Sequence, residues 1–128
     1  MRRMVPSEAQ VLANLRRGVV DHCVLAALRS GERYGLDIAR ELEGTLLAGT
    51  GTLYPLLSRL RKAGLVTTSW QESSEGPPRR YYRLTGDGDA ALQAFEAAWS
   101  PFRDAVDGAL AGGGGTRSEV ERRGEGPR

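Results

Sequence analysis

The middle of the chain gathers side chains that can hydrogen-bond to phosphate groups and to the edges of nucleic-acid bases. The hydroxyl and cationic groups with this capacity are those of Thr50, Thr52, Tyr54, Ser58, Arg59, Arg61 and Lys62. A guanidinium group can pair bidentately with guanine, whereas hydroxyl and ammonium groups bond phosphate oxygens or single base atoms. We interpret these residues as contacts to DNA bases and phosphates. The alternative interpretation is a solvated helix face, and the neighbouring elements favour DNA contact.

The same stretch has the period of an amphipathic helix. Its apolar residues recur at intervals of three and four, which places on one face Leu53, Leu56, Leu57 and Leu60. Gly64 follows as a left-handed cap, so we expect the helix to end there. A start at Gly49 would place Pro55 awkwardly, whereas a start with Thr52 as N-cap puts Pro55 in the first turn, where its missing N–H costs nothing. One face is therefore built to pack, and the other offers polar groups to a partner.

Elements on both sides of this helix complete a known arrangement. A shorter helix over residues 34–43 precedes it, and two strands, Val66–Trp70 and Arg80–Leu84, follow it on either side of a turn. Helix, turn, helix and two-stranded ribbon in this order predict a mainly α fold, the winged helix-turn-helix. In that fold the second helix enters the major groove of DNA and the ribbon, or wing, reaches the flanking backbone.

Two arginines stand at the tip of the predicted wing. Arg79 and Arg80 follow a pair of prolines that present them stiffly, so we expect them to contact phosphates or the minor groove. The alternative is a solvated turn. Tyr81 and Tyr82 must point to opposite faces of the ribbon, because strand side chains alternate. One ring is expected to pack inward, and the other to be available to a partner beside the arginines.

Three runs carry a resemblance to a known family: Tyr34-Gly35, then GTLYPLLSRLRKAGLV over residues 51–66, then GPPRRYYRLT over residues 76–85. In this order and spacing they closely resemble the PadR family of transcriptional regulators, over roughly residues 15–110. The resemblance implies a regulator that binds a palindromic operator in double-stranded DNA as a homodimer, through a long C-terminal dimerisation helix. The predicted DNA-contacting residues are Tyr34, Thr50, Thr52, Tyr54, Pro55, Ser58, Arg59, Arg61, Lys62, Arg79, Arg80 and Tyr81.

The remaining elements give the predicted domain boundaries. Ser7 and Gln10 form a capping pair for a first helix, and an apolar second helix over residues 19–29 is expected at the centre of the core. Thr85 or Asp87 would cap a long last helix. We therefore expect a winged-helix domain over residues 8–86, a dimerisation helix over residues 87–111 and a disordered tail over residues 112–128.

The last predicted helix carries large apolar side chains that nothing else in the sequence is left to cover. They recur at near-heptad intervals and comprise Leu92, Phe95, Trp99, Phe102, Val106 and Leu110. We expect a second copy of the chain to cover this stripe and so to form a dimer interface. Pro101 interrupts the pattern, and it either kinks the helix or splits it in two with Ser100 as a new N-cap.

The multidrug-sensing branch of the PadR family carries a tryptophan in a run similar to AFEAAWS, residues 94–100. This resemblance implies that Trp99 and its twofold mate hold a flat aromatic ligand between them, and the alternative is an ordinary interface aromatic. The acidic side chains of Asp104 and Asp107 lie nearby in the sequence and favour a cationic ligand. The predicted ligand-binding residues are Leu15, Val19, Phe95, Glu96, Trp99 and Arg103, the first two by resemblance to the branch.

Composition bounds the classes of function. The chain has 128 residues, a formal net charge of +2 and one cysteine, with no signal sequence and no apolar run long enough to span a bilayer, so we expect a cytoplasmic protein. Residues 1–64 carry ten Lys and Arg against six Asp and Glu, whereas residues 89–111 carry one against four, as expected if only one end meets phosphates. No metal-ligand spacing, phosphate loop or acid–base pair stands out, so we expect neither an enzyme nor a metal or cofactor site.

Together these observations predict a DNA-binding transcriptional repressor that a small aromatic or cationic ligand releases from DNA. Two alternatives stay open, which are a winged helix used only as a protein-interaction module and a DNA-binding repressor without a ligand site. The interaction module would bind DNA weakly and with a shallow salt dependence, because it would neutralise few phosphates.

Overall fold

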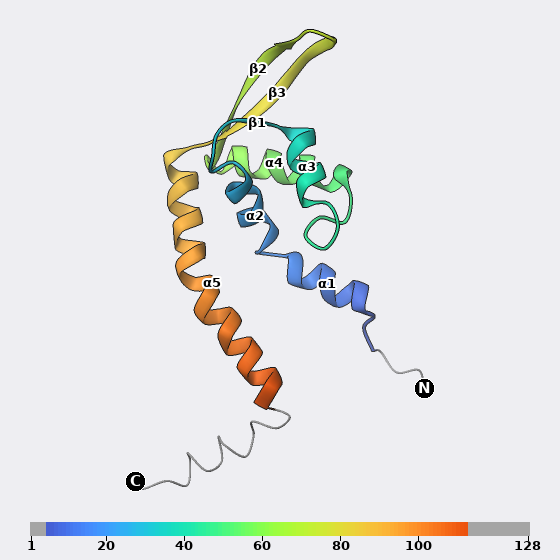
Figure 1. The fold of residues 1–128 in the computed structure, drawn as a ribbon, viewed down its shortest axis with the longest axis vertical. Coiled ribbons are helices and arrows are strands. Elements are labelled where there is room, and N and C mark those ends of the chain that lie inside the picture. Colours follow the sequence, from blue (N-terminus) through green and yellow to red (C-terminus); the bar gives the residue numbers. More distant parts are fainter. Residues whose placement is uncertain (1–4, 113–128) are drawn as a thin grey trace, which may run out of the picture. The chain divides into compact units, whose positions relative to one another are not determined.

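The computed structural model describes residues 5–112, and Figure 1 shows the order of their elements. They are α1 (Glu8–Arg16), α2 (Val20–Ala27), β1 (Arg33–Tyr34), α3 (Gly35–Leu42), the 3-10 turn η1 (Thr50–Thr52), α4 (Leu53–Lys62), β2 (Val66–Ser73), β3 (Gly76–Leu84) and α5 (Gly86–Gly112). This order confirms the predicted winged helix-turn-helix. The predicted disordered tail lies outside the described residues, except for Gly112, which ends α5.

The chain divides into two compact units, one ending at Gln93 and the other beginning at Ala94. We call the described part of the first unit, residues 5–93, the head, and the described part of the second, residues 94–112, the distal segment of α5. The first turns of α5 thus belong to the head, although the sequence predicted a boundary before that helix.

Local signals in the sequence set the ends of the helices. A capping box starts α1, where the Ser7 hydroxyl accepts from the Gln10 backbone N–H and the Gln10 side chain accepts from that of Ser7. Gly64 ends α4 with a φ of +78°, a conformation that a residue without a Cβ adopts freely. Thr52 is the N-cap of α4, and Pro55 lies in its first turn, where no partner for the missing N–H is needed. The structure confirms each of these predictions.

Thr85 fastens the start of α5 to the end of α4. Its hydroxyl donates to the Gly64 carbonyl at 2.7 Å and accepts from the Gly88 N–H at 3.0 Å, while its backbone N–H donates to the Leu65 carbonyl at 3.1 Å. Of the two predicted caps, Thr85 therefore holds the position and Asp87 lies inside the helix. Gly88 has to be small, because a Cβ there would lie 2.0 Å from the Leu65 carbonyl oxygen.

A three-stranded antiparallel sheet in the order β1-β3-β2 completes the head. β2 and β3 form the predicted wing, which rises beyond the helices in Figure 1 and runs further toward its tip than predicted. β1 adds to this sheet a third strand of two residues, which the sequence did not indicate. Tyr34 of β1 pairs with Tyr81 of β3, which pairs in turn with Ser69 of β2, so these three side chains share one face.

The helices and strands of the head bury one apolar core. Its members are Val20, Val24, Leu25, Leu28, Ile38, Ala39, Leu47, Leu53, Leu56, Leu57, Leu60, Val66, Tyr82 and Leu92. The four leucines of α4 are all among them, which confirms the predicted apolar face. Leu92 was predicted in the dimer stripe, but it is 2% exposed and belongs to the core of the head. The surface that the stripe can offer to a second copy therefore begins beyond Leu92.

α5 is one continuous helix that contains Pro101, so the alternative of two helices is wrong. In the distal segment the large apolar side chains stay exposed, with Trp99 at 36%, Phe102 at 62%, Val106 at 41% and Leu110 at 76%. The rings of Phe95 and Trp99 stack with centroids 5.7 Å apart, and Trp99 and Phe102 follow at 6.5 Å. The distal segment thus presents a continuous aromatic and aliphatic surface.

Candidate nucleic-acid interface

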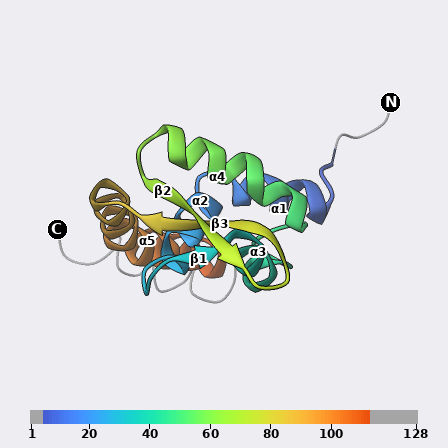
Figure 2. The same ribbon diagram turned by 90° about the horizontal axis from the view of Figure 1, so that it is seen from above.

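The outward face of α4 carries most of the predicted contact residues. Because an α-helix turns about 100° per residue, burial of its four leucines turns the opposite side to solvent. The exposed residues on that side are Tyr54, Pro55, Arg59, Arg61 and Lys62, and Ser58 is half-buried. Figure 2 shows that α4 runs along one edge of the head, so neither α3 nor the sheet covers this face.

Each flank of α4 borders a recess. On the side of the wing, a recess of about 380 Å³ is lined by Tyr34, Tyr54, Arg79, Arg80 and the residues of the wing tip. On the side of α1, a recess of about 530 Å³ is lined in part by the polar residues Arg16, Arg17, Asp21, Thr52 and Arg59. Figure 1 places the wing and α1 on opposite sides of α4. The polar face of α4 therefore lies between two basic recesses.

Tyr54 is held in place by close packing against Gly35. A Cβ at Gly35 would lie 3.2 Å from a ring carbon of Tyr54 and 3.3 Å from one of Tyr82, so glycine lets both rings pack closely against the start of α3. Burial, followed by the neighbouring phenols of Tyr34 and Tyr82, raises the pKa of Tyr54. The phenol, which is 45% exposed, therefore stays protonated at neutral pH and can donate a hydrogen bond to a phosphate or a base edge.

The two wing arginines each lie over an aromatic ring. The Arg79 guanidinium lies 4.8 Å from the centre of the Tyr34 ring, and the Tyr34 and Tyr81 rings are 5.8 Å apart. On the opposite face of β3, the Arg80 guanidinium lies 4.9 Å from the ring of Trp70, its partner in the strand register. Cation–π contact orients both side chains without neutralising their charge. Sequence reasoning placed the arginines at the tip but missed Trp70, which only the strand register could have indicated.

Glu32 ties the wing to the body of the head, a role that no sequence signal indicated. Its carboxylate accepts hydrogen bonds from the Ser69 hydroxyl at 2.8 Å and from the Gln71 side-chain amide at 2.6 Å. Ser69 and Gln71 stand two residues apart on β2 and so share a face. One carboxylate before β1 thus holds the far edge of the sheet and restricts the angle of the wing.

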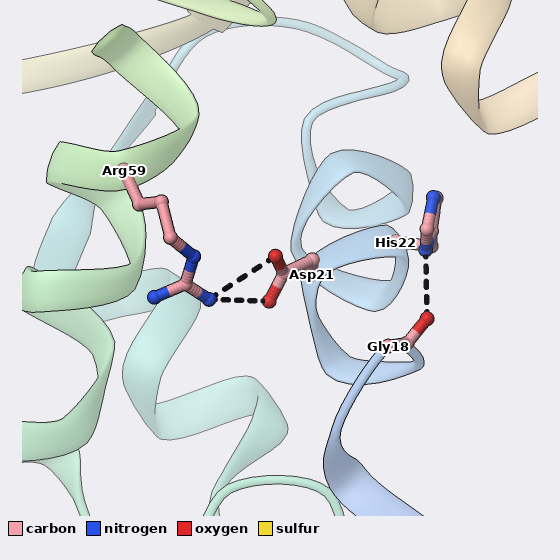
Figure 3. Close-up of polar contacts among 4 residues, drawn as sticks. All are labelled: Gly18, Asp21, His22 and Arg59. Atoms are coloured by element: carbon pink, nitrogen blue, oxygen red, sulfur yellow. Dashed lines mark hydrogen bonds and ion pairs between the residues drawn. The ribbon is translucent and has the colours of Figure 1, made fainter. Parts of the chain in front are cut away.

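Two predicted contact residues on the α1 flank already have partners within the chain. Figure 3 shows Arg59 reaching from α4 to Asp21 on α2, where one guanidinium nitrogen donates to both carboxylate oxygens at 2.9 and 3.1 Å. The neighbouring His22 turns away from this pair, toward the Gly18 carbonyl at 3.1 Å. The Thr52 hydroxyl donates to the Gly49 carbonyl at 2.7 Å, so only its acceptor capacity is left for a partner.

The predicted ligand-binding residues fall in both units. Leu15 on α1 is 63% exposed, and Val19 is half-buried at the N-cap of α2. The distal segment supplies the stacked rings of Phe95 and Trp99 together with Glu96 and Arg103. Arg103 forms an ion pair with Asp104 at 3.2 Å. A ligand pocket built from all six residues stays a prediction.

Two other kinds of site have no counterpart in the part of the chain that the structure describes. Within residues 5–112, no three His, Cys, Asp or Glu side chains gather as metal ligands would. No helix in the same range is long and apolar enough to cross a membrane. Cys23 is a half-buried free thiol whose pKa is raised by burial.

Comparison with known proteins decides the family. The model of the PadR-like family of transcriptional regulators matches residues 24–94, more than half of the chain. The chain belongs to the PadR-like family. A PadR-like transcription factor from Bacteroides fragilis is 40% identical, with a TM-score of 0.63, over 76% of this chain and 95% of the other. A PadR family regulator from Eggerthella lenta is 34% identical, with a TM-score of 0.68, over 80% of this chain and 90% of the other. A PadR-like regulator from Bacillus cereus is 31% identical, with a TM-score of 0.68, over 76% of this chain and 96% of the other.

Membership of the PadR-like family makes the chain a DNA-binding transcriptional regulator and not an enzyme, as predicted. The matched residues run from α2 into α5 and so contain α3, α4 and the wing. The family match therefore covers the helix-turn-helix and both arginines that the sequence singled out.

Proposed function

We propose that this PadR-like regulator is a cytoplasmic homodimer that represses transcription by binding a palindromic operator, and that a small aromatic or cationic ligand relieves the repression. The observation that carries the proposal is the division of surfaces along the chain. The head exposes a polar, cationic face on α4, whereas the distal segment exposes an apolar stripe. The first suits DNA, and the second suits another copy of the chain.

For DNA, the dimensions of the head suggest one docking mode. α4 has the length and the polar outward face of a recognition helix, and a B-DNA major groove admits one α-helix. With α4 in the groove, the wing lies beside it with Arg79 exposed at its tip, in a position to meet the phosphate backbone or the minor groove. Tyr54, held by Gly35 at the start of α4, would then donate to a phosphate or a base edge.

Dimerisation would be mediated by the distal segment. Trp99, Phe102, Val106 and Leu110 recur at intervals of three and four on a continuous helix, so they form a stripe that two copies can share about a twofold axis. Two heads linked in this way match the symmetry of a palindrome whose half-sites lie about one DNA turn apart.

The ligand would bind where the stripe is aromatic. The stacked pair of Phe95 and Trp99 offers a flat surface, and the twofold mate of Trp99 offers a second one. Asp107 adds a negative charge to the distal segment, whereas the charge of Arg103 is already paired with Asp104. A planar cation is therefore favoured over a planar anion.

The DNA-binding mode is tested by fluorescence anisotropy with the DNA upstream of the protein's own gene, over a series of salt concentrations. Replacing both Arg79 and Arg80 by Ala should weaken binding to every sequence and lower the salt slope by about one unit for each phosphate that the variant no longer neutralises. Arg40→Ala, which removes one exposed charge from α3 away from both recesses, is the control. Unchanged affinity and slope in the double variant would contradict the docking mode. A wild-type protein with a shallow slope would favour the protein-interaction module.

Ligand binding is tested by titrating a flat cationic dye against tryptophan fluorescence. The chain has two tryptophans, so Trp70→Phe reports on Trp99 and Trp99→Ala reports on Trp70. We expect quenching in wild type and in Trp70→Phe, no quenching in Trp99→Ala, and near-normal operator affinity in Trp99→Ala. Quenching that persists without Trp99 would place the dye elsewhere, and no quenching by any such dye would favour a repressor without a ligand site.

A further inference from the structure

The recess on the α1 side of α4 is fixed in shape by contacts from α1. The Arg16 side chain donates to the Thr45 carbonyl at 2.9 Å and to the Gly44 carbonyl at 3.1 Å. These bonds join the end of α1 to the link between α3 and α4, so α1 is held at the flank of α4. The recess of about 530 Å³ lies between them, with Val20, Leu47 and Leu56 among its apolar lining residues.

Three guanidinium groups and one carboxylate line this recess, and they differ in what they already bind. Arg16 bonds backbone carbonyls, and Arg59 is paired with Asp21 while its side chain is still 61% exposed. Arg17, exposed in the short link between α1 and α2, has no side-chain hydrogen bond or ion pair among residues 5–112. The recess therefore holds three positive charges. Arg16 is bound to backbone carbonyls, Arg17 has no partner among the described residues, and a carboxylate partly neutralises Arg59.

A helix in the major groove of DNA has a phosphate backbone on each side, because the groove is bounded by both strands. The wing lies on one side of α4 and α1 on the other (Figure 1). The larger recess is lined by residues of α1, α2 and α4 and so belongs to the side away from the wing. The wing arginines account for one strand only. Arg17 and Arg59 stand at the flank where the other strand would pass.

We propose that Arg17 and Arg59 form a second phosphate-binding surface for the DNA strand opposite the wing, and that Asp21 limits its strength by neutralising Arg59. The inference rests on the docking mode proposed above. In it, Arg17 contributes a standing phosphate contact, and Arg59 exchanges its bond with Asp21 for one with a phosphate when DNA is bound. The chemistry recognised is a phosphodiester backbone, without regard to base sequence.

The first test replaces Arg17 by Ala and measures binding to the upstream DNA and to an unrelated duplex of the same length. With one phosphate fewer neutralised, the salt slope should fall by about 0.9 per head and binding should weaken about fivefold per head at about 0.15 M salt. Both duplexes should be affected equally, because a phosphate contact carries no sequence information. Arg40→Ala should change neither slope nor affinity. An Arg17→Ala variant that behaves like Arg40→Ala would overturn the proposal.

The second test predicts a gain in DNA affinity instead of a loss, and it uses the ion pair between Asp21 on α2 and Arg59 on α4. Asp21→Asn removes the ion pair that Arg59 has to give up on binding, so DNA binding should become tighter, while the salt slope stays close to that of wild type because the number of phosphates contacted is unchanged. In the double variant Asp21→Asn with Arg59→Ala, this gain should vanish. If the gain persists without Arg59, it reflects the general loss of a negative charge and the assignment of Arg59 is wrong.

These tests separate the inference from the function on which it rests. A wild-type protein that binds no DNA at any salt concentration would overturn both. If affinity falls in the wing variant but not in Arg17→Ala, the second surface alone is overturned. Circular dichroism of each variant shows whether the head is folded, and if Asp21→Asn unfolds, Arg17→Ala alone decides the outcome.

Discussion

The α4 helix of the head and the distal segment of α5 differ in which of their side chains face solvent. In the head, the four leucines of α4 are at most 7% exposed, and the polar residues of the same helix face solvent. In the distal segment, Phe102 and Leu110 are more than half exposed on a helix of similar regularity. Large apolar side chains exposed at regular intervals along one helix need a partner to cover them.

The same two regions differ in charge. Cations gather around α4 and the wing, where Arg17, Arg79 and Lys62 are exposed, whereas the distal segment has acidic residues and one arginine that is already paired with Asp104. Surface charge and surface apolarity are thus separated along one chain. This separation gives the head the charge that suits a polyanion, and it gives the distal segment an apolar surface with few cations.

The largest expected effect comes from placing a charge in the exposed stripe. Phe102→Asp should separate the two copies, and the loss of linked heads should weaken operator binding about 100-fold to 10,000-fold. The head should stay folded, because Phe102 lies outside its core. Sedimentation and anisotropy on the same samples measure both properties. A wild type that is monomeric at micromolar concentration would remove the basis for this comparison.

Truncating a leucine should lower the free energy of unfolding far more in the core of the head than in the distal segment. Leu57→Ala removes a fully buried side chain from α4 and should lower the free energy of unfolding by about 2–5 kcal/mol. Leu110→Ala, the same substitution at a site 76% exposed, should change it by less than about 0.5 kcal/mol when measured in the Phe102→Asp background. Urea unfolding of the two variants measures the change in the free energy of unfolding. Equal changes would show that Leu110 is packed as tightly as Leu57.

A smaller effect is expected where the head positions Tyr54. In Gly35→Ala the added Cβ crowds the rings of Tyr54 and Tyr82, which have to shift by a few tenths of an ångström. Better helix propensity of alanine offsets the crowding in stability, so the unfolding midpoint should barely move. DNA binding should still weaken by about 1 kcal/mol, because Tyr54 is displaced from its contact. Matched losses in stability and binding would mean that Gly35 serves packing alone.

The smallest effect concerns Cys23, which lies in the head on α2. Because burial raises the pKa of this thiol, its reaction with a disulfide reagent at pH 8 should be several times slower in the folded protein than in urea. The rate should be the same in Phe102→Asp as in wild type, because the head does not depend on the dimer. A faster reaction in that variant would show that dimerisation protects α2.

Most of the head could be predicted from sequence because its signals are local. The leucine spacing of α4, the Ser7–Gln10 box and the left-handed Gly64 each depend on residues within one or two helical turns. The pairing of β1 with β3 could not be predicted in this way. A strand of two residues has no alternation to detect, and its partner lies almost fifty residues further along the chain.

The finer features of the site depend on contacts between residues that are far apart in the sequence, so local sequence patterns could not predict them. Arg59 and Asp21 are 38 residues apart, and their ion pair follows from how α2 and α4 pack. The ring beneath Arg80 follows from the strand register, which places Trp70 opposite it. Periodicity assigned Leu92 to the dimer stripe, but only tertiary packing could show that the core of the head already uses it.

The hydrogen bonds of Thr85 connect the start of α5 directly to the end of the recognition helix. Because Thr85 bonds the Gly64 carbonyl and caps α5 at the same time, one side chain sets where the two helices meet. The end of α4 and the direction in which α5 starts therefore cannot be altered independently of each other within the head.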